Sequence, residues 1–225
     1  MVPRDMKDIP IPTLERLCRI YGICLALERE KTDRISSARL AQRLGVSAHV
    51  VRKDLSHLGA VGVIGAGYGV TELRQALATG LGLERALTAC VVGLGRLGSA
   101  LLEHKGLAEA GARIVAGFDA NINRLETIRT TVAVYPAYEI EDIVRRERIA
   151  LGIIAVPAGA AQAVANRLIA GGVQCILNFA PVVVRDPHGR VPVRTVDVTN
   201  EIRVLSALTG GMSQKAEGDS DIRSQ

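Results

Sequence analysis

The chain has 225 residues and is 48% apolar, which excludes a disordered chain and leaves room for two domains. It has no apolar run near the roughly 20 residues of a membrane helix and no visible signal peptide, so we expect a cytoplasmic protein without a membrane partner. Its four cysteines lie singly in apolar stretches, and its four histidines show no metal-ligand spacing with them. We therefore expect reduced thiols and no metal site.

The net charge of +5 is concentrated near the N-terminus. Residues 34–58 hold five Lys or Arg side chains against one acidic residue, an excess that favours an anionic partner. A solvated helix face would carry the same local charge, so the charge alone leaves both interpretations open.

Residues 1–82 predict a winged helix-turn-helix domain. Apolar residues recur there at three- and four-residue steps, and Ser47 and Gly45 stand where a helix cap and a helix end are needed. The expected helices are 13–31, 38–44, 48–58 and 71–79, after a loose arm over 1–11. A short turn between the second and third helices is typical of DNA-binding proteins.

The expected third helix has two unlike faces. Val51, Leu55 and Leu58 form an inward apolar line, whereas the opposite line carries hydrogen-bond donors and no large apolar group. Such a face suits a helix in the major groove, although a small helical bundle could also leave it in solvent. The residues of this segment that we expect to contact DNA are Ser47, His49, Arg52, Lys53 and Ser56.

A glycine-rich stretch over 59–69 predicts a short hairpin, the wing of the domain. It carries no Lys or Arg, so phosphate contacts there would come from backbone N–H groups or from Tyr68.

Residues 86–98 predict a strand, a tight turn and the start of a helix. The turn reads Gly93-Leu94-Gly95-Arg96-Leu97-Gly98, and its glycines would let a diphosphate approach the N-terminus of the helix. A second expected strand ends at Asp119, 21 residues after Gly98, where a dinucleotide-binding unit needs an acid for the ribose hydroxyls. The alternative is a tight turn with no ligand.

The rest of the chain alternates strand and helix, which predicts a doubly wound parallel sheet of the Rossmann type over 83–198. Ligands of such sheets lie beyond the carboxyl ends of the strands. The expected strands are 87–92, 113–118, 131–135, 150–156, 174–179 and 191–196, and the expected helices are 97–108, 139–147, 159–170 and 199–208. Residues 210–225 are polar and contain glycine, so we expect a disordered tail.

Nearly the whole chain, from about Ile9 to Leu208, resembles the Rex family of redox-sensing transcriptional repressors. An ordered set of motifs carries the resemblance and is more specific than any single motif. It comprises Gly45-Val46-Ser47, Val51-Arg52-Lys53-Asp54-Leu55-Ser56, Gly65-Ala66-Gly67-Tyr68, Gly93–Gly98, Val156-Pro157-Ala158, Ile176-Leu177-Asn178-Phe179-Ala180-Pro181 and Val196-Asp197-Val198-Thr199.

The resemblance implies a homodimer that binds a palindromic operator in double-stranded DNA and releases it when NADH rises. It also implies that a C-terminal helix, here 199–209, is swapped into the partner subunit. The residues implied to bind NAD(H) are Gly93, Leu94, Gly95, Arg96, Leu97, Gly98, Asp119, Val156, Pro157, Asn178, Phe179, Ala180 and Asp197. Arg16 would pair with Asp197 in one of the two states, as part of the switch.

Two residues and the wing depart from the family pattern. Arg96 stands where the family usually has Asn, and could strengthen diphosphate binding or tolerate a second phosphate. His104 stands where a Tyr would complete the switch cluster of Arg16 and Asp197, so the switch could be altered, pH-sensitive or lost. The wing lacks the family's usual basic residues, which would weaken the affinity for DNA.

An enzyme on the same nucleotide fold, binding NAD(P) or CoA, is the alternative. Such an enzyme needs a general acid or a nucleophile beside its cofactor, and of the four histidines only His104 lies near the glycine turn. We therefore expect a regulator that does not consume its nucleotide. An acid at position 119 repels a 2′-phosphate, which favours NAD over NADP.

Overall fold

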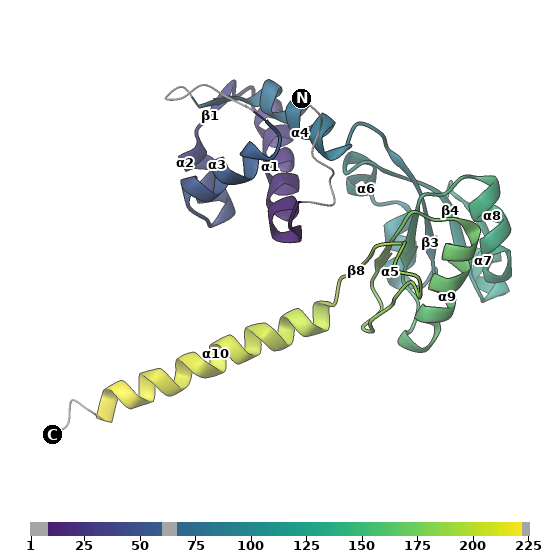
Figure 1. Ribbon diagram of the computed structural model, residues 1–225. Helices are drawn as coiled ribbons and strands as arrows, with labels where there is room; N and C mark the ends of the chain where they lie inside the picture. The colour runs from purple at the N-terminus through teal and green to yellow at the C-terminus, as the bar shows by residue number, and fades with distance from the viewer. Residues whose placement is uncertain (1–8, 60–66, 222–225) are drawn as a thin grey trace. The chain divides into compact units, whose positions relative to one another are not determined.

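The computed structural model describes the backbone of residues 9–59 and 67–221, with side chains as far as residue 209. The chain divides into two compact units, Met1–Arg85 and Ala86–Gln225, close to the division predicted after residue 82 (Figure 1). Most of the expected arm over 1–11 and of the expected wing over 59–69 lies outside the described residues.

Within its described residues, the first unit has four helices and a two-stranded sheet. Its helices are α1 (Ile11–Arg29), α2 (Ser37–Leu44), α3 (Ala48–Ser56) and α4 (Val70–Leu81). The oxygens of Ser36 and Ser47 accept hydrogen bonds from backbone N–H groups of α2 and α3, and Gly45 ends α2 with a φ of +68°. The helix-turn-helix thus has the serine caps and the left-handed glycine that its sequence predicts.

A short antiparallel pair of strands closes the first unit. Strand β1 (Arg34–Ile35) pairs with β2 (Tyr68–Gly69), a pairing between segments 33 residues apart that the sequence pattern did not indicate. The core beneath it is formed by α1, α3 and α4, through Leu17, Ile20, Val51, Leu73 and Leu77 among others.

An ion pair joins α1 to the buried face of α3. The guanidinium of Arg16 donates to both oxygens of Asp54, from Nε to Oδ2 at 2.6 Å and from Nη2 to Oδ1 at 2.8 Å. Asp54 is buried, with a side chain 3% exposed, while Arg16 is 24% exposed and also donates to Thr13. The hydrogen bond to Asp54 raises the pKa of Arg16 further above its usual range. A two-point contact of this kind fixes the rotation of α3 against α1.

The second unit is built on a six-stranded parallel sheet with the order β5-β4-β3-β6-β7-β8. The strands are β3 (Leu87–Val92), β4 (Ala112–Asp119), β5 (Ala133–Pro136), β6 (Leu151–Ile154), β7 (Cys175–Asn178) and β8 (Val193–Thr195). The order reverses between β3 and β6, which is the switch point where doubly wound sheets bind their ligands. The predicted Rossmann topology is confirmed.

Helices cover both faces of this sheet. On one face α8 (Ile140–Arg146) and α9 (Ala158–Gly171) lie side by side and bury the larger apolar cluster with Phe118 and Ile154 (Figure 1). On the other face α5 (Arg96–Leu102), α6 (Lys105–Glu109) and α7 (Ile122–Thr127) contribute to a second cluster around Leu94 and Leu102. A 3-10 turn, η2 (Ala137–Glu139), precedes α8.

Three helices of this unit differ from the prediction. The helix expected over 97–108 is divided into α5 and α6, because His104 adopts an extended backbone conformation between them. Helix α7 was not expected, since its one turn carries too few apolar residues to show a period. Helix α10 (Val198–Asp221) continues past residue 209, so the structure does not divide the expected helix from the expected tail there.

The four cysteines are single and none forms a disulfide. Burial raises the pKa of all four thiols, that of Cys24 to about 11 and that of Cys90 to about 12. Within the described residues, no helix is long and apolar enough to span a membrane. The same residues contain no cluster of three metal-ligating side chains.

Replacing Arg16 with Ala would leave Asp54 as a buried carboxylate without its guanidinium. We expect the free energy of unfolding to fall by about 2–3 kcal/mol, less than for a fully enclosed pair because Arg16 is partly exposed. Urea denaturation followed by circular dichroism measures the change. The control is Arg19→Ala, on an exposed position of the same helix, which should stay within about 0.5 kcal/mol of the parent. Equal losses in the two variants would contradict a specific role for the pair.

Candidate nucleotide pocket and DNA-reading helix

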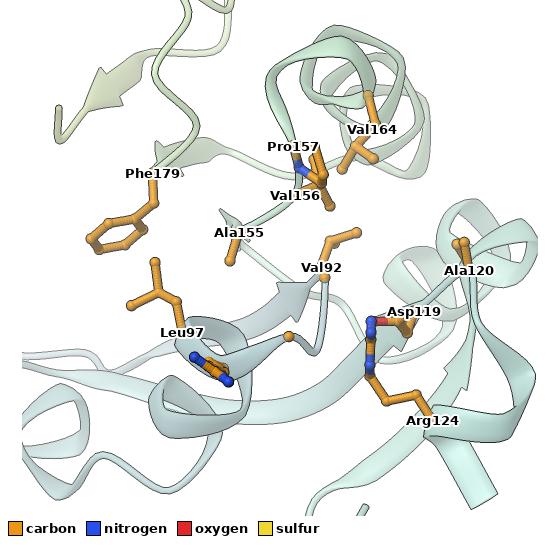
Figure 2. A pocket seen from close by; sticks show the side chains of 15 residues that line it. Val92, Leu97, Asp119, Ala120, Arg124, Ala155, Val156, Pro157, Val164 and Phe179 are labelled. Atoms are coloured by element: carbon orange, nitrogen blue, oxygen red, sulfur yellow. The ribbon is translucent and has the colours of Figure 1, made fainter. Parts of the chain in front are cut away.

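A cavity of about 570 Å³ opens at the carboxyl ends of β3, β4 and β6 in the second unit. Figure 2 shows Phe179 and Leu97 at one end of it, Asp119 and Arg124 at the other, and the apolar side chains of Val156 and Pro157 between them. The residues that line it are Val92, Gly93, Gly95, Arg96, Leu97, Asp119, Ala120, Arg124, Ala137, Ala155, Val156, Pro157, Ala160, Val164 and Phe179. A long apolar cleft with one charged end fits an elongated ligand that carries a polar sugar.

The three glycines of the turn after β3 differ in how much space surrounds them. Gly93 has a φ of +93°, and a Cβ there would lie 2.6 Å from the carbonyl oxygen of Ala155. A Cβ on Gly98 would overlap the carbonyl oxygen of Gly93, so this glycine lets α5 pack closely on the turn. A Cβ on Gly95 would meet nothing within 4 Å, and Gly95 is also the N-cap of α5. The open position is therefore the one at the helix N-terminus, where a diphosphate would approach.

Asp119 ends β4 with a side chain that is 6% exposed. Its Oδ2 accepts from the Leu94 backbone N–H at 2.7 Å and its Oδ1 from the Asn121 backbone N–H at 2.8 Å. Burial alone would raise the pKa of Asp119, but these hydrogen bonds and the Arg124 guanidinium outweigh it and hold the pKa below its usual value. The carboxylate is therefore ionised at neutral pH and can accept hydrogen bonds from a ribose.

Arg124 of α7 completes the charged end of the cavity. Its Nη1 donates to Oδ2 of Asp119 at 2.8 Å, and its side chain is 44% exposed (Figure 2). This pair was not predicted, because a short helix that shows no period brings the two residues together.

The loop after β7 differs from the prediction. Phe179 lines the cavity as expected, whereas Asn178 and Ala180 are buried and do not. The side-chain amide of Asn178 donates to the carbonyls of Ala180 and Val182 and to the hydroxyl of Thr195, and its oxygen accepts from the Ala180 N–H. These bonds hold the loop that carries Phe179, and Asn178 is not among the residues that line the cavity.

Two further predicted residues lie at helix starts. Asp197 caps α10, where its Oδ1 accepts from the Thr199 hydroxyl and the Asn200 N–H, and these bonds lower its pKa. His104 is the exposed N-cap residue of α6, with its ring over Gly106. The structure does not place either side chain in the cavity.

Most of the predicted DNA contacts lie on the exposed face of α3. His49, Arg52, Lys53 and Ser56 are exposed, while Val51, Asp54 and Leu55 are buried on the opposite face. The Arg52 guanidinium donates to the Ser37 hydroxyl, and the Ser56 hydroxyl to the Lys53 carbonyl. The face therefore presents cations and polar groups from a rigid, capped helix, as a major-groove reader does.

Tyr68 differs from the other predicted DNA contacts. Its side chain is 9% exposed and packs in the core of the first unit, and burial raises the pKa of its hydroxyl. The sequence placed Tyr68 on the wing, but the pairing of β2 with β1 turns it inward. Tyr68 therefore anchors β2 in the core of the first unit.

Two family models match the chain, one on each unit. Residues 8–56 match the family described as "Putative DNA-binding protein N-terminus", and residues 84–182 match the family described as "CoA binding domain". The first covers the helix-turn-helix, and the second covers the sheet from β3 to the loop after β7.

Relatives of known name extend along both units. The chain is 41% identical over 203 residues to the redox-sensing transcriptional repressor Rex of Carboxydothermus hydrogenoformans, covering 89% of this chain and 97% of that one. It is 38% identical to Rex of Streptomyces coelicolor over 200 residues, which cover 89% of this chain and 77% of the relative.

Solved structures agree with this relationship. The Rex-family repressor RSP in complex with β-NAD⁺ and operator DNA has a TM-score of 0.84 at 29% identity, covering 93% of this chain and 97% of RSP. RSP in complex with β-NADH has a TM-score of 0.81 at 27% identity, with 93% of this chain and 98% of that one covered. The chain therefore belongs to the Rex family of redox-sensing transcriptional repressors.

Proposed function

We propose that this protein represses transcription by binding operator DNA and that NADH, bound in the cavity of the second unit, releases the DNA. One observation carries the proposal: a helix with an exposed cationic face and a pocket for a dinucleotide occur in a single chain. The relative RSP, solved with β-NAD⁺ and operator DNA and again with β-NADH, supports it. A protein that binds operator DNA and NAD(H) would act in the cytoplasm.

The ligand that best fits the cavity is NAD(H). The Gly93–Gly98 turn would hold the diphosphate, with Arg96 adding a positive charge beside it. Asp119 would accept from the hydroxyls of the adenosine ribose, and Phe179 would lie at the nicotinamide end. An ionised carboxylate at the ribose disfavours the 2′-phosphate of NADP(H).

The DNA would be read by α3. Arg52 and Lys53 have the charge and exposure to bind phosphates or guanine edges, and His49, Ser56 and the Ser47 cap would add further hydrogen bonds. Tyr68 has no part in this proposal because it is buried.

The proposed active form is a homodimer on a palindromic operator, since a two-fold protein reads two half-sites. Helix α10 supports it, because Val198, Ile202, Leu205 and Leu208 repeat at helical spacing and are 58–62% exposed. An apolar line on an exposed helix favours packing against a second copy of the chain.

The coupling between the two units is proposed to involve Arg16, Asp197 and His104. Arg16 uses three of its five N–H donors on Asp54 and Thr13, so it could bind a further carboxylate without releasing α3. His104, in place of the family's Tyr, would make this contact dependent on pH.

The enzyme alternative is less well supported. The titratable residues that line the cavity are Arg96, Asp119 and Arg124, and Asp119 lies at the ribose end, held by three donors. A dehydrogenase needs a proton donor or acceptor beside the nicotinamide. The named relatives are transcriptional repressors, so the nucleotide is proposed to act as an effector.

We expect NADH to weaken operator binding by about fivefold or more, and NAD⁺ to weaken it less. Linkage requires that the operator weaken NADH binding by the same factor, with a coupling of about 1–3 kcal/mol. Fluorescence anisotropy of a labelled operator, titrated with each nucleotide at one stated salt concentration, measures the effect. Operator affinity that is the same at every NADH concentration would refute the proposal.

The substitution Gly95→Ala should abolish most nucleotide binding while the protein stays folded. The added Cβ meets no protein atom within 4 Å but occupies the approach of the diphosphate. Calorimetric titration with NADH and a thermal melt measure the two effects. In Gly98→Ala the Cβ overlaps backbone, so this matched variant should instead lower the melting temperature. Wild-type NADH affinity in Gly95→Ala would mean that the diphosphate does not lie at this turn.

A further inference from the structure

Two of the three donors on Asp119 belong to the backbone and one does not. The N–H groups of Leu94 and Asn121 are fixed by the glycine turn and by the start of α7. The third donor is the guanidinium of Arg124, on a flexible side chain that is 44% exposed at the edge of the cavity. A ligand that needs an acceptor on this carboxylate can therefore displace Arg124, but not the backbone groups.

The adenosine ribose needs such an acceptor. Its 2′-hydroxyl donates to the acid that ends the second strand of a dinucleotide-binding sheet, which here is Asp119. Arg124 already donates to Oδ2, the same oxygen that accepts from Leu94. The three donors occupy three of the roughly four acceptor sites of the carboxylate, so a ribose hydroxyl that donates to Oδ2 must displace Arg124.

We propose that Arg124 lowers the affinity for adenine dinucleotides by competing with the adenosine ribose for Asp119. The inference rests on the proposed NAD(H) site. Because NAD⁺ and NADH share the same adenosine half, the competition weakens both by the same factor. Arg124 thus sets the nucleotide concentration at which the cavity fills and leaves the discrimination between the two redox forms unchanged.

The opposite role for Arg124 would be to bind a 2′-phosphate. An arginine near the ribose can do so in NADP-binding proteins. In this chain the guanidinium is already paired with an ionised carboxylate, which would repel a phosphate brought to the same place. We therefore favour competition, and the experiment below distinguishes the two roles.

The test compares the full-length wild type with Arg124→Ala by calorimetric titration with ADP and 2′-deoxy-ADP. If Arg124 competes with the ribose, its removal should raise the ratio of the ADP affinity to the 2′-deoxy-ADP affinity by about fivefold. This is about the factor that one partly exposed ion pair contributes to an equilibrium constant. Taking the ratio of the two ligands cancels any effect of the lost positive charge on the phosphates. NAD⁺ and NADH should both bind more tightly in the variant, by factors that agree within about twofold.

The matched control is Arg129→Ala. Arg129 is an exposed arginine five residues further along, it does not line the cavity, and its removal costs the same charge. Its preference for ADP over 2′-deoxy-ADP should equal that of the wild type.

The outcomes separate this inference from the proposed function. Binding of NAD(H) by the wild type, with an unchanged ADP preference in Arg124→Ala, would overturn the inference and leave the proposed function in place. Tighter binding of NADP⁺ than NAD⁺ by the wild type, lost in Arg124→Ala, would also overturn it and assign Arg124 to the 2′-phosphate. A wild type that binds neither ADP nor NAD(H) would overturn the proposed function itself.

Discussion

The carboxylate of Asp119, at the end of β4, connects the two segments that form the charged end of the cavity with it, the turn after β3 and helix α7. It accepts from the turn after β3 through Leu94, from the start of α7 through Asn121, and from Arg124. Since the group is 6% exposed, the two backbone bonds are shielded from water and hold the turn and the start of α7 firmly, whereas Arg124 donates from a side chain that is 44% exposed. The hydrogen bond from the Leu94 N–H to this carboxylate holds the glycine turn in its conformation. The same carboxylate lines the cavity.

The first unit uses a carboxylate in a comparable way. Asp54 is buried on the inner side of α3 and receives two hydrogen bonds from Arg16 of α1. The outer side of α3 is left to Arg52 and Lys53, which face solvent. Each unit therefore fixes its functional surface with one buried acid and one arginine, and the arginine is the partner that can still be reached from outside.

Local signals made much of this structure predictable. Serine caps and Gly45 define the helix-turn-helix, and the spacing from Gly98 to Asp119 indicated an acid that does line the cavity. The predictions that differ from the structure concern residues whose positions depend on contacts between distant segments. The pairing of β2 with β1 buries Tyr68, and the loop after β7 consumes the amide of Asn178. Helix α7 is too short to show a period, so the pair of Arg124 with Asp119 was not foreseen.

The burial of the thiols bears on how the protein can sense redox state. With pKa values of about 11 and 12, Cys24 and Cys90 carry almost no thiolate at neutral pH, and the thiolate is the nucleophile that attacks peroxides and disulfides. Cys18 and Cys175 are also shifted toward the protonated form. Burial of Cys24 and Cys90 therefore disfavours the direct oxidation of these two thiols. An oxidant would reach the repressor mainly by changing the nucleotide pool, so the protein would report metabolic state and stay indifferent to brief chemical stress.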